Sequence, residues 1–156
     1  MIARDLVKAV AAEVREAVKN LKLPDEHQSS RDARLLPVNV YEQFLPITEG
    51  NDTAFIPYVL VEWLGTTDEL DGKDYRSISH VGLSMGTFAA ESWSWQDPFH
   101  LTETVREHLL THRLIAKKFR LIGDADWAIE PNRPAPFFYT YATLTYSTFQ
   151  PVAGLF

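Results

Sequence analysis

The sequence predicts an α+β domain in which an antiparallel or mixed β-sheet of about four to five strands packs with two α-helices. Three observations support this fold class. The chain has 156 residues, of which 46% are hydrophobic and 23% charged, a composition typical of a globular domain with its own core. Helical periodicity occurs in two separate segments, and strand-like alternation fills most of the rest. The order is helix, three strands, helix, two strands, which lacks the regular alternation of a doubly wound parallel sheet.

The first predicted element is an amphipathic helix from Ile2 to Leu21. Its apolar residues recur at spacings of three and four, which places them on one helical face. They are Val7, Val10, Val14, Ala17, Val18 and Leu21. Pro24 closes the segment because proline disfavours helical geometry in the residue before it. We therefore divide the chain into an N-terminal helix (1–24), a polar linker (25–36) and an α+β domain (37–156).

Strand patterns follow the linker. The predicted strands are Leu35–Pro46, Phe55–Leu64 and Arg76–Phe88. The first and third alternate between apolar and polar residues, and the second is a nearly continuous apolar run. Between the second and third strands lies an acidic segment, Asp68–Asp74, which we expect to be an exposed hairpin tip.

The second helix has the clearest start signal in the chain. Asp97 can cap it through its carboxylate, and Pro98 suits the first helical position because its missing N–H would be unpaired there. Its apolar stripe is Leu101, Val105 and Leu109. The remaining predicted strands are Phe119–Ile122, resuming at Trp127–Glu130, and Phe137–Phe149.

Composition excludes several classes of function. The formal net charge of −6 argues against a protein that binds nucleic acid through its phosphates, which needs a basic surface. The chain has no cysteine, so it has no disulfide and no thiolate metal site. No run approaches the roughly 18 apolar residues of a membrane-spanning helix, and the N-terminus lacks the apolar run of a signal peptide. We expect no membrane association and synthesis in the cytoplasm.

The strongest metal candidate is a pair of histidines, His108 and His112, with Glu107 adjacent. Two histidines four apart share a helix face and can share a metal ion. The zinc-protease signature needs glutamate directly after the first histidine, where this chain has Leu109. Histidines are also common near helix C-termini because their positive form suits the dipole. We therefore predict no metal and no cofactor, with a small metal-dependent enzyme as an alternative.

The acidic segment superficially suggests a calcium loop. With Asp68 as its first ligand, Leu70 falls at the third position and Ser79 at the twelfth, where liganding oxygens are required, so the pattern fails. A functional role that remains open is a loop that faces a partner or a channel. Its candidate residues are Asp68, Glu69, Asp71 and Asp74.

Two other motifs have structural explanations. The segment Gly82–Gly86 matches the letters G-x-S-x-G, but a nucleophile elbow needs a turn between strand and helix, and these residues lie within a predicted strand. We therefore predict no catalytic residue. Trp93 and Trp95 precede the second helix and are candidate interface aromatics; the alternative is that they cover the core.

One further feature is an ordered series of segments: Val40–Glu42, Ile56–Val61, Val81–Phe88, Val105–Leu110, Ile115, Phe119–Leu121, Trp127, the prolines at 131, 134 and 136, and Phe137–Tyr139. No single motif is specific, and the series covers about three quarters of the chain. The series resembles the tail-terminator and tail-completion proteins, which join head and tail in long-tailed bacteriophages. The final strand departs from the family pattern, with Thr140, Ala142 and Tyr146 where glycine and tryptophan are expected, and the N-terminal helix is an addition.

The resemblance implies a structural virion protein without enzymatic activity. Such subunits form a ring, in most cases hexameric, at the head-proximal end of the tail, where the ring ends tail-tube growth. The implied partners are other copies of the chain, the tail tube protein and a head-completion or connector protein. DNA would pass through the central channel without specific binding. A head-side connector or a tail-tube-like subunit is the alternative within this class.

Overall fold

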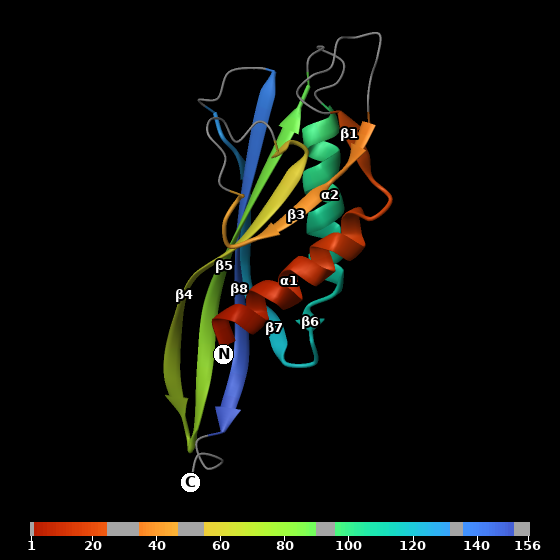
Figure 1. The fold of residues 1–156 in the computed structure, drawn as a ribbon. Coiled ribbons are helices and arrows are strands. Elements are labelled where there is room, and N and C mark those ends of the chain that lie inside the picture. The colour runs from red at the N-terminus through yellow and green to blue at the C-terminus, as the bar shows by residue number, and fades with distance from the viewer. Residues whose placement is uncertain (1, 25–34, 47–54, 90–95, 132–135, 152–156) are drawn as a thin grey trace.

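The computed structural model describes residues 2–24, 35–46, 55–89, 96–131 and 136–151 (Figure 1). These segments contain two helices, α1 (Ile2–Val18) and α2 (Gln96–Thr111). The strands are β1 (Lys22–Pro24), β2 (Leu35–Pro37), β3 (Asn39–Glu42), β4 (Tyr58–Asp71), β5 (Asp74–Phe88), β6 (Leu114–Ile115), β7 (Phe119–Ile129) and β8 (Phe137–Pro151). Trp93 and Trp95 lie outside the described residues. No helix in the described segments is long and apolar enough to cross a membrane.

Six strands form one mixed sheet in the order β3-β4-β5-β8-β7-β6, and β1 pairs with β2 in a separate two-stranded sheet. The pairing of β3 with β4 is parallel, whereas the other neighbours in the main sheet are antiparallel. The α+β class with a mixed sheet is therefore confirmed. The predicted number of strands was too low, because β1 and β6 have three and two residues, too short to carry a clear alternation, and because the predicted strand Leu35–Pro46 is divided into β2 and β3.

The main core lies between one face of the sheet and both helices, so the structure has two layers. The fully buried apolar residues of α1 are Leu6, Val10, Ala11 and Val14, and those of α2 are Leu101, Val105 and Leu109. Their spacing confirms the apolar stripes that the sequence predicted, although α1 ends at Val18 and not at Leu21. A buried hydrogen bond of 2.8 Å between the hydroxyls of Thr102 and Thr140 also joins α2 to β8.

A smaller apolar cluster lies on the other face of the sheet. In it, Tyr58 and Tyr139 flank Gly86 across three neighbouring strands. A Cβ atom on Gly86 would lie only 2.9 Å from Cζ of Tyr58, and closer still to another atom of the ring. Glycine is required here because the tyrosine ring occupies the space of a side chain.

The predicted strand limits implied a long loop at the acidic segment, but the structure has a tight turn there. β4 continues past Leu64 to Asp71, and β5 begins at Asp74, so only Gly72 and Lys73 form the turn. Gly72 has a φ of 66° at the first central position, where type II′ hairpin turns favour glycine. The prediction of an exposed hairpin tip holds, but the hairpin is much longer than expected.

Candidate functional site

The far half of the β4–β5 hairpin extends beyond the helices, and we call residues 65–80 the arm (Figure 1). It begins at a β-bulge between Trp63 and Gly65, where one extra residue on β4 shifts the register with β5. Gly65 adopts a φ of 154°, which a side chain would disfavour. Bulges increase strand twist and bend the strand that contains them. The bulge and Gly65 therefore explain why the arm bends away from the rest of the sheet.

One edge of the arm lacks a strand partner in the described part of the chain. β3 covers β4 only as far as Val61. The side chain of Gln43 then pairs with the next residue along this edge, because its Oε1 accepts a 2.9 Å hydrogen bond from the backbone N–H of Trp63. Beyond that point the outer edge of β4 is open within the described residues, and an open edge can pair with another chain.

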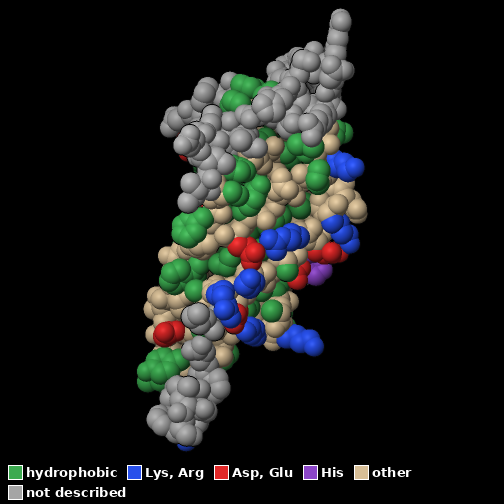
Figure 2. Space-filling model, in the orientation of Figure 1, with side chains coloured by type: hydrophobic (Ala, Val, Ile, Leu, Met, Phe, Trp, Pro, Cys, Tyr) green, Lys and Arg blue, Asp and Glu red, His purple; other side chains and the backbone are tan. Residues whose placement is uncertain are grey.

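Large apolar side chains are exposed on and beside the arm. The exposed fractions are 55% for Leu64, 67% for Leu70, 40% for Tyr75 and 62% for Phe149 on the end of β8. Leu70 and Tyr75 are register partners on neighbouring strands, so they lie side by side. Figure 2 shows apolar side chains along the side of the molecule that carries the hairpin. Clustered exposed apolar residues are typical of surfaces that contact a partner.

The four predicted acidic residues all lie at the outer end of the arm. Asp68, Glu69 and Asp71 are exposed on β4, and Asp74 is half-buried at the start of β5. Asp68 is held by a hydrogen bond from the hydroxyl of Ser77 on the opposite strand. Strand geometry here excludes a calcium loop around Asp68, as the sequence indicated, and leaves an acidic surface at the tip.

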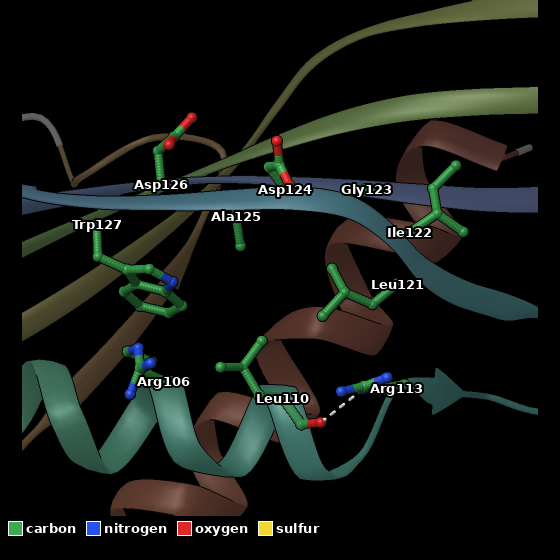
Figure 3. Close-up of a pocket in the computed structure, with 10 residues that line it drawn as sticks. All are labelled: Arg106, Leu110, Arg113, Leu121, Ile122, Gly123, Asp124, Ala125, Asp126 and Trp127. Carbon is green, nitrogen blue, oxygen red and sulfur yellow. Dashed lines mark hydrogen bonds between the residues drawn. The ribbon is translucent and has the colours of Figure 1, made fainter.

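A hollow of ≈ 530 Å³ lies between α2 and β7, at the opposite side of the sheet from the free edge of β4. In Figure 3, Leu121 and Trp127 point from β7 toward α2, while Asp124 and Asp126 point away from it. The indole Nε1 of Trp127 is buried without a hydrogen-bond partner in the described part of the chain. A buried unpaired donor is costly, and its burial keeps this N–H out of direct reach of another molecule. Sequence reasoning did not identify this hollow.

The two histidines of the metal candidate do lie together, but Glu107 is not the carboxylate beside them. Nε2 of His108 lies 2.7 Å from Oε2 of Glu13 on α1, and the rings of His108 and His112 are stacked with centroids 4.1 Å apart. Glu13 was missed because it is 95 residues away in the sequence. Only the packing of α1 on α2 brings these groups together.

The G-x-S-x-G letters lie in the middle of β5. Ser84 is paired with Leu60 on β4 and Tyr141 on β8, so it lies inside the sheet and not at a turn between strand and helix. The strand context that the sequence predicted for this motif is confirmed. This segment therefore lacks the geometry of a nucleophile elbow.

Comparison with solved structures identifies a neighbour of nearly equal length. It is a chain of the "Virion of native gene transfer agent (GTA) particle", with a TM-score of 0.51 and 15% sequence identity. The alignment covers 92% of this chain and 96% of that chain. The two chains share a fold. No protein-family model matches the sequence, and no curated protein matches it either.

Proposed function

We propose that this protein is a structural subunit of a virion that forms a ring at the head-proximal end of a phage tail. The resemblance of its sequence to tail-terminator proteins implies that the ring is hexameric. The ring ends tail-tube growth and joins the tail to the head around the DNA channel. The observation that carries the proposal is the fold shared with a chain of a virion particle over 92% of the residues. The ordered series of sequence segments supports the position at the tail terminus.

The arm and the opposite side of the sheet suit the contacts that a ring needs. A closed ring is built from heterologous contacts, in which one patch of a subunit meets a different patch of its neighbour. The first patch is the free edge of β4 with exposed Leu70 and Tyr75. The second is the side of the sheet formed by β6 and β7, where the hollow between α2 and β7 lies. The two patches lie at opposite edges of one sheet, as propagation around a ring requires.

The test combines size-exclusion chromatography, light scattering and negative-stain microscopy of the purified chain. We expect closed six-fold rings, and we expect the double substitution L70K/Y75K to give monomers because two desolvated ammonium groups oppose the contact. A matched control is Leu35→Lys on β2, which adds a charge at a side chain that is 53% exposed and lies in the separate two-stranded sheet, outside both patches. Far-ultraviolet circular dichroism checks that all variants remain folded.

Ring closure can require the end of a tail as template, so the same variants are also tested in assembled particles. A reconstruction that places the chain away from the head–tail junction contradicts the proposed position. Long tubes in place of closed rings would instead identify a tail-tube-like subunit. Unchanged assembly of L70K/Y75K would show that the arm does not make the subunit contact.

A further inference from the structure

Three potential metal ligands meet where the two helices cross. Glu13 lies on α1, His108 lies in the last turn of α2, and His112 directly follows that helix, where its backbone N–H donates a 2.9 Å hydrogen bond to the carbonyl oxygen of His108. One ligand atom from each residue lies within 4.8 Å of the other two. The helices fix this arrangement, because α1 and α2 pack into the same core through their apolar stripes.

The hydrogen bonds of His112 prepare it to bind a cation. Its Nδ1 lies 2.9 Å from the backbone carbonyl oxygen of His108. A carbonyl oxygen can only accept, so Nδ1 must carry the proton, and Nε2 of the neutral ring keeps a free lone pair. Metal-binding histidines commonly have one ring nitrogen oriented in this way by a backbone carbonyl.

The surroundings favour a cation that enters from solvent. The side chains of His108 and Glu13 are 15% and 28% exposed, and His112 is exposed. Glu16 and Glu107 line the same surface hollow as the two histidines, and Glu16 is paired with Lys19. The buried hydroxyl of Tyr146 has no hydrogen-bond partner in the described residues. Burial, together with the nearby charge of Glu13, raises the pKa of this hydroxyl. It therefore stays a neutral donor.

We propose that Glu13, His108 and His112 form a zinc site that clips α1 to α2. Two imidazoles and one carboxylate are a known set of protein ligands for zinc, with water at the fourth position. Zinc would bind Nε2 of His108 after the ring gives its Nε2 proton to solvent and carries its proton on Nδ1, and the two ligand atoms would move apart by about half an ångström. This site differs from the sequence candidate, because Glu13 from another helix takes the place of Glu107.

Isothermal titration of the full chain with zinc chloride at neutral pH tests the site. We expect one zinc ion per chain and a higher melting temperature in its presence, because an ion that binds only the folded state stabilises it. His112→Ala and Glu13→Gln should each weaken binding at least tenfold. Magnesium chloride should have no effect, because magnesium prefers oxygen ligands.

Two control variants separate this site from general surface binding. Glu107→Gln and His100→Ala alter exposed residues of α2 that are outside the cluster, and both should bind zinc like the unchanged chain. Each melting-temperature shift is compared with the zinc-free state of the same variant, so loss of the Glu13 hydrogen bond does not confuse the result. Equal binding by His112→Ala and the unchanged chain, or no binding at all, would overturn the proposal.

Discussion

Among single residues, Gly86 is a position where packing requires glycine. It lies in the interior of β5, where glycine normally weakens a strand, yet the ring of Tyr58 fills the place where its side chain would lie. Tyr58 is 3% exposed and belongs to the apolar cluster on the outer face of the sheet. Because it is buried, the ring cannot move away without disturbing its neighbours.

We predict that Gly86→Ala lowers the free energy of unfolding by about 1–3 kcal/mol, as overpacking of a core does. Gly82→Ala is a matched control on the same strand, because its Cβ would meet Cδ1 of Leu64 at 3.2 Å, and that side chain is exposed and free to adjust. Urea denaturation measures both variants. Equal stability of the two would show that Tyr58 does not constrain the strand.

The histidine cluster shows what the sequence can and cannot predict about a site. The spacing of His108 and His112 correctly placed the two rings side by side, although His112 lies one residue past the end of α2. The same reasoning named Glu107 because it is adjacent in the chain; Glu107 lines the same hollow, but it is not among the three residues whose ligand atoms meet. Glu13 carries no local signal of its role, because its position beside His108 depends entirely on tertiary packing.

Among the elements, α1 is part of the main core and not an appendage on its surface. Leu6 is fully buried in the same cluster as residues of β4, β5 and α2. We predict that Leu6→Ala lowers the free energy of unfolding by about 2–5 kcal/mol, as removal of a buried leucine side chain does. Lys8→Ala is the control, since its 3.9 Å ion pair with Glu42 lies at the surface, where such pairs contribute little.

Urea denaturation followed by circular dichroism measures these changes. A Leu6→Ala variant as stable as the control would mean that α1 does not support the core in solution. The division of the chain at residues 24 and 36 stays a prediction. Cooperative loss of the whole fold in this variant would argue against treating residues 1–24 as an independent unit.

The elements that face the core could be predicted from sequence, and the part of the arm that belongs to β4 could not. The apolar stripes of both helices, and the alternation of Val81, Leu83 and Met85 on β5, reflect burial on one side. The outer part of β4 has solvent near both faces, so its residues need not alternate, and Asp68–Asp71 resemble a loop in the sequence. The parallel pairing of β3 with β4 also has no local signal, because the residues of one strand do not indicate in which direction its neighbour runs.

For the whole molecule, the arm combines two properties that a ring around DNA would use. Its exposed apolar residues can contact a neighbouring subunit, while its acidic residues give the tip a negative surface. The arm carries four carboxylates against two basic residues, Lys73 and Arg76. If the tips line the channel, this charge repels the DNA backbone and leaves the channel free for passage.

We predict that neutralising the tip creates affinity for duplex DNA that the unchanged protein lacks. The variant D68N/E69Q/D71N/D74N changes the formal net charge from −6 to −2 (−6 + 4 = −2) and leaves Lys73 and Arg76 unopposed on the arm. The matched variant E103Q/E107Q/D124N/D126N has the same net charge, with four exposed carboxylates neutralised on α2 and β7. Fluorescence anisotropy with labelled DNA, at a series of salt concentrations, should show binding by the first variant only, and that binding should weaken as salt rises. Equal binding by both variants would show that net charge, and not the position of the arm, controls contact with DNA, and would argue against a tip that faces the channel.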